Sequence, residues 1–94
     1  AHPKERKKLF AYKPDATTDF EKADGALNAA YKKAMSECED KEAKDLLKAA
    51  QRAWITYRDA ETAFYVAAFG QKFGDKKVEQ DIKTRLTLAR AKDL

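Results

Sequence analysis

The polar residues around the only tryptophan are the strongest candidates for chemistry in this sequence. In the stretch QRAWITYRDAE, residues 51–61, Arg58 follows Tyr57 directly and lies one helical turn after Trp54. A guanidinium presents five donors in a planar fork and stacks on aromatic rings. Such a group either joins neighbouring helices or faces a partner, and the spacing alone leaves both roles open.

Catalytic and metal chemistry lack the residues that they need. The only histidine is His2, the only serine is Ser36 and the only cysteine is Cys38. Nucleophilic catalysis of the Ser–His–Asp or Cys–His kind therefore lacks a base, and no Cys/His cluster offers metal ligands. A single cysteine excludes an internal disulfide, and no glycine-rich phosphate loop is present. We therefore expect neither an enzyme nor a protein that binds a metal or another cofactor.

The net charge of +4 is concentrated at the N-terminus. Residues 1–14 hold five Lys or Arg against one Glu, whereas residues 15–94 hold 15 basic and 15 acidic residues. The sequence predicts a basic arm over 1–14 and a neutral domain over 15–94. Such an arm either binds an anionic surface or is a solvated terminus, and Leu9, Phe10 and Tyr12 within it favour packing.

Apolar residues recur every three or four positions in three segments, which predicts helices over about 18–37, 41–69 and 76–92. Thr18 and Glu21 form a predicted capping box at the first helix, and Gly70 suits the C-terminal cap of the second. The resulting fold class is all-α, an antiparallel three-helix bundle with a long central helix. No apolar run approaches the length of a membrane span.

The expected turns bring polar side chains together at the middle of this bundle. Counting from each turn, Arg58 lies near Asp24 and Thr87, and Asn28 faces Gln51. We expect a structural network that fixes helix register, in which losing one partner of a buried ion pair costs about 3–5 kcal/mol. The alternative is a shallow groove that binds a ligand or a protein loop, with aromatics beside arginine as anchors.

Three motifs in this region resemble the LprI-like lysozyme-inhibitor family. DGALNAAYKKAM at 24–35 is similar to its D-x-x-L-N-x-x-Y element, and LKAAQRAWITYRDAE at 47–61 to its Q-x-A-W-x-x-Y-R-D-x-E element. LTLARAKDL at 86–94 is similar to its closing L-T-x-x-R-x-x-x-L pattern. The family pattern falls on the following residues: Asp24, Leu27, Asn28, Tyr31, Gln51, Trp54, Tyr57, Arg58, Asp59, Glu61, Thr87 and Arg90. One departure is Thr62, where many relatives have Cys, so a disulfide to that position is absent here.

The resemblance implies a small helical bacterial domain that is exported, with lysozyme inhibition known for few members. We expect a periplasmic or secreted module that binds a protein partner, with a lysozyme-like hydrolase as one candidate. We expect the module itself to be a monomer or a weak dimer. The alternative is a binder of the envelope or of a polyanion surface through the basic arm, although we do not expect nucleic acid as the partner. Ala1 in place of Met favours signal-peptide cleavage, with a cloning scar as the alternative.

Common lysozymes are basic proteins, so an inhibitor is expected to present a local acidic surface. The candidate lies at the first turn, where Asp45 and four other acidic residues crowd around Lys41 and Lys44. Acidic residues near a helix start also complement its dipole, which is the alternative explanation of this cluster. The four candidate residues are Glu37, Glu39, Asp40 and Glu42.

Overall fold

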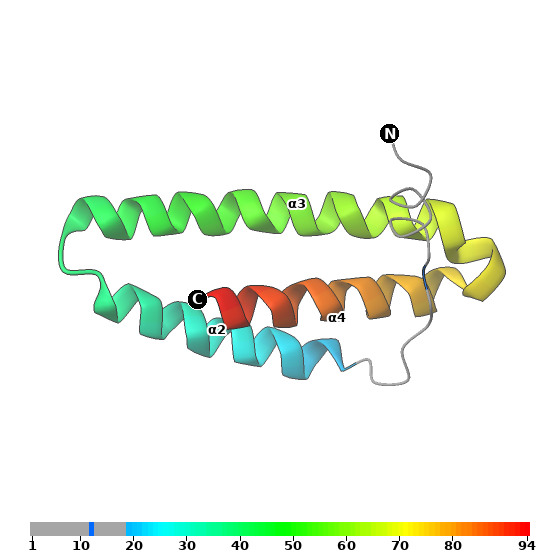
Figure 1. Cartoon of the computed structure of the whole chain (residues 1–94), viewed down its shortest axis with the longest axis horizontal. Helices are drawn as coiled ribbons and strands as arrows, with labels where there is room; N and C mark the ends of the chain where they lie inside the picture. The colour runs from blue at the N-terminus through cyan, green and yellow to red at the C-terminus, as the bar shows by residue number, and fades with distance from the viewer. Residues whose placement is uncertain (1–11, 13–18) are drawn as a thin grey trace, which may run out of the picture.

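Three α-helices make up the fold. The computed structural model describes Tyr12 and residues 19–94, and it contains α2 (Phe20–Glu37), α3 (Lys41–Phe73) and α4 (Asp75–Asp93). Consecutive helices run in opposite directions, and α4 lies between α2 and α3 (Figure 1). The predicted all-α, three-helix fold is confirmed. The predicted basic arm, apart from Tyr12, lies outside the described residues.

Helix α2 begins and ends at side-chain caps. The carboxylate of Asp19 accepts a hydrogen bond of 3.0 Å from the backbone N–H of Lys22, which satisfies one of the free donors of the first turn. The N-cap is therefore Asp19 rather than the predicted Thr18, which lies outside the described residues. After Glu37 the backbone becomes extended at Cys38, whose thiol donates to the carbonyl of Ala34 at 3.3 Å.

Helix α3 has 33 residues and is about 50 Å long at 1.5 Å per residue. Asp40 caps its start by accepting from the N–H of Ala43 at 2.7 Å. The prediction that Gly70 ends this helix is wrong, because the helix continues to Phe73 and Gly74, with φ of 97°, ends it. Gly70 is buried inside the helix, and a Cβ there would collide with the carboxylate of Asp75. The sequence signal at Gly70 therefore reflects the close approach of α4, not a helix end.

The core is small and lies where the end of α3 meets the start of α4. Val78 and Ile82 of α4 are buried together with Tyr12, whose ring lies 5.3 Å from the rings of both Phe69 and Phe73. The prediction that Tyr12 packs is confirmed, whereas Leu9 and Phe10 lie outside the described residues. Partly buried residues complete this cluster: Tyr65, Val66, Phe69, Phe73 and Leu86.

The helices form a flat molecule that measures 47 × 32 × 18 Å. Helix α4 packs against both α2 and α3, which make little backbone contact with each other. Beyond the end of α4, α2 and α3 project as a hairpin (Figure 1). We call residues 37–42 the hairpin tip. Within residues 19–94, no helix combines the length and the apolar character needed to cross a membrane.

Candidate functional site

Arg58 is held between two aromatic rings. Its side chain is 13% exposed, and its guanidinium carbon lies 5.3 Å from the centre of the Trp54 ring and 5.6 Å from that of Phe20. The Nε atom donates to the carboxylate of Asp59 at 3.0 Å. Cation–π contacts stabilise by about 0.5–1 kcal/mol at exposed sites and by more as the ring and the cation lose water. Arg58 therefore fastens the start of α2 to the middle of α3.

The expected ion pair between Arg58 and Asp24 is not formed. The carboxylate that binds Arg58 belongs to Asp59, its neighbour in sequence, and Asp24 is half-buried on α2. Thr87 is fully buried, but its hydroxyl makes no hydrogen bond within the described part of the chain. The expected pair is missing because α4 lies between α2 and α3. Counting from the turns had assumed that all three pairs of helices pack equally closely.

A second polar contact joins α3 to the last turn of α4. The Nε atom of Arg90 donates to the side-chain oxygen of Gln51 at 3.0 Å. Both residues are partly buried. The network expected from the sequence is thus divided into an aromatic cluster at Arg58 and a separate Gln51–Arg90 bond, which together hold α2 and α4 against α3.

A hollow of about 360 Å³ opens between α2 and α3. Asn28, which was expected to face Gln51, lines it together with Gln51, and Ile55 at 40% exposure supplies an apolar surface. Two amides and two cations within one hollow can bind a carboxylate or a peptide group of a partner. The lining residues are Asn28, Tyr31, Lys48, Gln51, Arg52 and Ile55; we call this the hairpin hollow.

Tyr57 lies on the outer surface of α3 and is 51% exposed. Its hydroxyl donates to the carboxylate of Glu61 at 3.1 Å, one turn further along the helix. Partial desolvation, followed by the hydrogen bond and the charge of Glu61, raises the pKa of Tyr57 above its ordinary value of 10.0. The pair presents a protonated tyrosine and an acceptor side by side to solvent.

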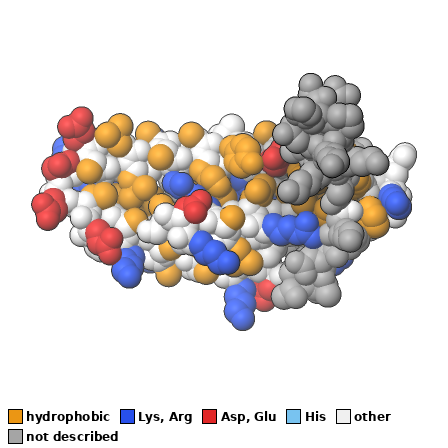
Figure 2. Space-filling model, viewed as in Figure 1, with side chains coloured by type: hydrophobic (Ala, Val, Ile, Leu, Met, Phe, Trp, Pro, Cys, Tyr) orange, Lys and Arg blue, Asp and Glu red, His pale blue; other side chains and the backbone are white. Residues whose placement is uncertain are grey.

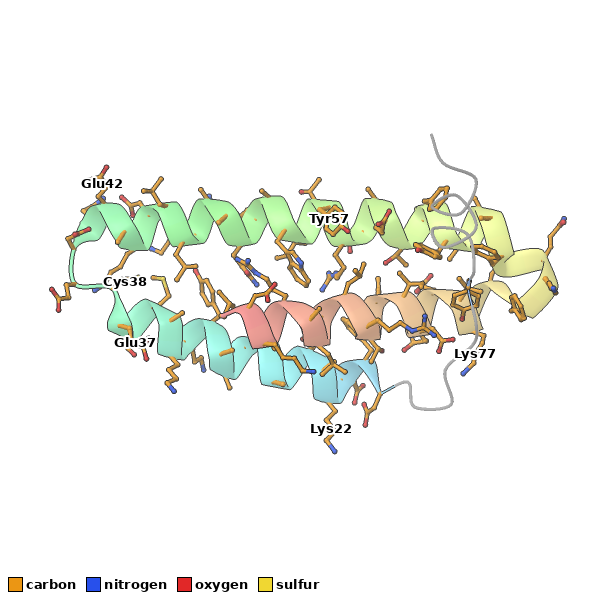
Figure 3. All side chains as sticks on the ribbon, viewed as in Figure 1. Lys22, Glu37, Cys38, Glu42, Tyr57 and Lys77 are labelled. Carbon is orange, nitrogen blue, oxygen red and sulfur yellow. The ribbon has the colours of Figure 1, made fainter. Side chains whose placement is uncertain are left out.

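The hairpin tip carries the acidic residues that the sequence singled out. All four are exposed, and Figure 2 shows acidic side chains gathered at this end of the molecule. Figure 3 labels Glu37 on α2 and Glu42 on α3, on either side of the turn. Asp40 has a structural role as the cap of α3, and Lys41 binds Asp45 at 2.7 Å. Residues 37–45 hold five carboxylates against Lys41 and Lys44, so the local potential is negative.

A comparison with protein families identifies the domain. The model described as "Lysozyme inhibitor LprI" matches residues 11–94. The chain belongs to the LprI lysozyme-inhibitor family. No curated protein and no solved structure matches it. The match includes Tyr12, so this buried residue belongs to the LprI domain.

The description of the LprI family is that of a lysozyme inhibitor. In the described part of this LprI domain, no group of three or more His, Cys, Asp or Glu is arranged to hold a metal ion. Thr62, where the resemblance led us to note a departure from the family pattern, is buried, and its hydroxyl donates to the carbonyl of Arg58 at 2.7 Å. The position is therefore filled by a hydroxyl that bonds within its own helix.

One buried polar contact of this LprI domain was not anticipated from the sequence. Asp81 is fully buried, accepts a hydrogen bond from the hydroxyl of Tyr12, and lies 3.3 Å from the Nζ atom of Lys77. The signal that could have found it is the place of this carboxylate between Val78 and Ile82, on the apolar face of α4. A carboxylate in such a position needs a partner from elsewhere in the chain.

Proposed function

We propose that the chain is an exported protein-binding module that inhibits a lysozyme-type hydrolase with its α2–α3 hairpin. The observation that carries the proposal is the hairpin tip, which projects beyond α4 and exposes four carboxylates (Figures 1 and 2). A projecting tip of two helices has a shape that fits a cleft. Membership of the LprI family supports both the choice of target and the export of the protein.

Electrostatic attraction favours this orientation of binding. Residues 15–94 have no net charge, so a basic lysozyme is not attracted by the domain as a whole. The tip concentrates negative charge at one end, since residues 37–45 hold five carboxylates and two lysines. Complementary potentials of this kind raise the rate of association more than they raise the affinity. The tip therefore orients the encounter, and the affinity must come from contacts elsewhere.

The hairpin hollow supplies those contacts in our proposal. Glycoside hydrolases carry a pair of carboxylates in the cleft that binds the sugar. Lys48 and Arg52, beside the amides of Asn28 and Gln51, offer donors that match carboxylates of this kind. Ile55 adds an exposed apolar surface at the same place. In this proposal the tip binds the basic surface of the partner, and the hollow binds the acidic cleft of the same partner.

The test is a cell-wall turbidity assay with purified protein in a few-fold molar excess over lysozyme. We expect slower lysis, and we expect Glu39→Lys with Glu42→Lys to weaken inhibition at least tenfold. Glu79→Lys, an exposed site on α4, is the matched control and should leave inhibition unchanged. Asp40 is not replaced, because it caps α3. Full lysis at both low and moderate salt would contradict the proposal.

A second variant separates the hollow from the tip. Lys48→Glu together with Arg52→Glu should abolish inhibition if the hollow contacts the cleft, while the circular-dichroism spectrum stays helical because both side chains are exposed. Inhibition that survives this change would remove the hollow from the proposal and leave the tip.

The alternative function is binding of an anionic surface through the basic arm. It rests on the five basic residues of positions 1–14 beside a neutral domain. Deletion of residues 1–8 removes Lys4, Arg6, Lys7 and Lys8 and spares the buried Tyr12. Binding of the intact chain to anionic vesicles that falls steeply with salt and disappears on this deletion would favour the alternative.

A further inference from the structure

An apolar stripe runs along the outer surface of α3 and has the spacing of a helix-pairing seam. Its members recur at intervals of four and three residues, as the a and d positions of a coiled coil do, and all of them are exposed. The three large ones are Leu46, Tyr57 and Phe64, at 63%, 51% and 43% exposure. We call this surface the α3 stripe; it consists of Leu46, Ala50, Ala53, Tyr57, Ala60 and Phe64.

The α3 stripe is separate from the surfaces already described. At 100° per residue, Lys48, Arg52 and Ile55 of the hairpin hollow fall on the opposite flank of α3. The stripe carries no charged residue from Leu46 to Phe64, which are about 27 Å apart along the helix. Figure 2 shows hydrophobic side chains along this edge of the molecule. An uncharged stripe of this length on a highly charged protein indicates an interaction surface.

We propose that the α3 stripe binds the α3 stripe of a second copy of the chain, with the two helices antiparallel. In antiparallel pairs, a positions pack against d positions. This register places Phe64 against Leu46 of the second copy, and Ala50 against its Ala60. At the centre, the small Ala53 meets the large Tyr57 of the other chain. Each member of the stripe then lies opposite a member of the other stripe, so the surface is complementary to itself, as a two-fold interface requires.

The charges at the two ends of α3 select the antiparallel orientation. The hairpin tip is acidic, whereas Lys72 and Lys76 are exposed at the α3–α4 turn. Figure 2 shows the acidic groups at one end of the molecule and basic groups toward the other. The same register brings Lys72 alongside Glu39 of the second copy. A parallel pair would instead place acidic tip against acidic tip, which costs free energy.

The size of the stripe sets the strength of the dimer. Six side chains on one helix bury less than the roughly 1,200 Å² at which stable interfaces begin, so the dimer belongs to the weak class. We therefore expect a monomer at about 10 μM and a dimer at several hundred micromolar. The dimer does not depend on the function proposed above, and no lysozyme enters its test.

Sedimentation equilibrium of the full chain between 10 μM and 1 mM tests the dimer. We expect the mass to approach twice that of the monomer, and Ala53→Glu to weaken association at least tenfold because it buries two like charges near the two-fold axis. Ala29→Glu, at an exposed alanine of α2, is the matched control and should leave association unchanged. A monomer throughout the range, or equal effects of the two variants, would overturn the proposal. If the chain is a monomer, the remaining candidate to bind the α3 stripe is a different protein.

Disulfide trapping tests the orientation. In a Cys38→Ser background, Ala50→Cys and Ala60→Cys are oxidised separately and as a mixture. The antiparallel register cross-links only the mixture, because ten residues, about 15 Å, separate each site from its own copy, beyond the 7 Å reach of a disulfide. Cross-linking of each variant with itself would overturn the antiparallel arrangement.

A charge exchange tests the register. Lys72→Glu should weaken the dimer, and adding Glu39→Lys should restore it. A double variant that associates more weakly than the single one would contradict the register.

Discussion

The hydroxyl of Tyr12 donates a hydrogen bond to the carboxylate of Asp81, 69 residues further along the chain. The ring of Tyr12 packs on Phe69 and Phe73, and Lys77 approaches the other oxygen of Asp81. One side chain thus closes the apolar end of the fold and binds its buried carboxylate. The LprI match from residue 11 includes this contact. Tyr12 is therefore part of the domain, although the charge pattern groups it with the arm.

Removing this hydroxyl should destabilise the protein measurably. Tyr12→Phe keeps the ring but leaves an oxygen of buried Asp81 without its donor, so we expect a loss of about 2 kcal/mol in the free energy of unfolding. Urea unfolding measures the loss. Tyr57→Phe is the control, because it removes an exposed tyrosine hydrogen bond and should cost less than about 0.5 kcal/mol. Equal losses would mean that Asp81 does not need Tyr12.

Replacing Arg58 should cost less than the loss of a buried ion pair. Its carboxylate partner Asp59 is 55% exposed and stays solvated without it, so the cost of Arg58→Ala comes from the contacts with Trp54 and Phe20. We expect about 1–3 kcal/mol. Asp59→Ala should cost less than about 0.5 kcal/mol, as for an exposed pair. Urea unfolding of both variants checks this, and a loss above about 4 kcal/mol for Arg58→Ala would point to a buried charged partner.

The titration of Tyr57 should depend on Glu61. Because its pKa is raised in the folded protein, Tyr57 keeps its proton at a pH where the unfolded chain has lost it. Stability should therefore fall as the pH rises from about 10 through the folded pKa. Tyrosinate absorbance, taken as the difference from Tyr57→Phe, should show a lower pKa in Glu61→Gln. An unchanged pKa in that variant would show that Glu61 has no influence.

Two glycines should respond to alanine in opposite ways. Gly74 has φ of 97°, a conformation that side chains rarely adopt, so Gly74→Ala should destabilise by about 1–3 kcal/mol. Gly25 lies inside α2 with open space around it, so Gly25→Ala should stabilise by up to about 1 kcal/mol. Thermal unfolding of both variants measures the pair. A stabilising Gly74→Ala would contradict the observed backbone at the turn.

The helices could be predicted from the sequence because their apolar period and polar breaks are local signals. The turn after Glu37 was placed correctly for this reason. The end of α3 was placed wrongly. Glycine is a typical capping residue, but Gly70 instead leaves room for the close approach of Asp75. Only the packed structure distinguishes these two uses of glycine.

The candidate site was predictable in its residues but not in its pairing. Trp54 and Arg58 do lie together, since four residues of one helix fix their contact. The partner of Arg58 was predicted wrongly, because it depends on which helices touch, and a sequence without long connections does not specify that α4 lies between its neighbours. The packing of Tyr12 was predicted, but its bond to Asp81 was not, because the two residues are 69 positions apart in the sequence.

The position of α4 also limits how this chain acquires its structure. Since α2 and α3 make little backbone contact, most of the packing surface of this hairpin is against α4. The buried surfaces of both helices, among them Ala23 and Leu27 of α2, stay exposed until α4 is synthesised and docks between them. Helices α2 and α3 therefore depend on α4 to bury these surfaces, and the three helices should unfold together as one cooperative unit.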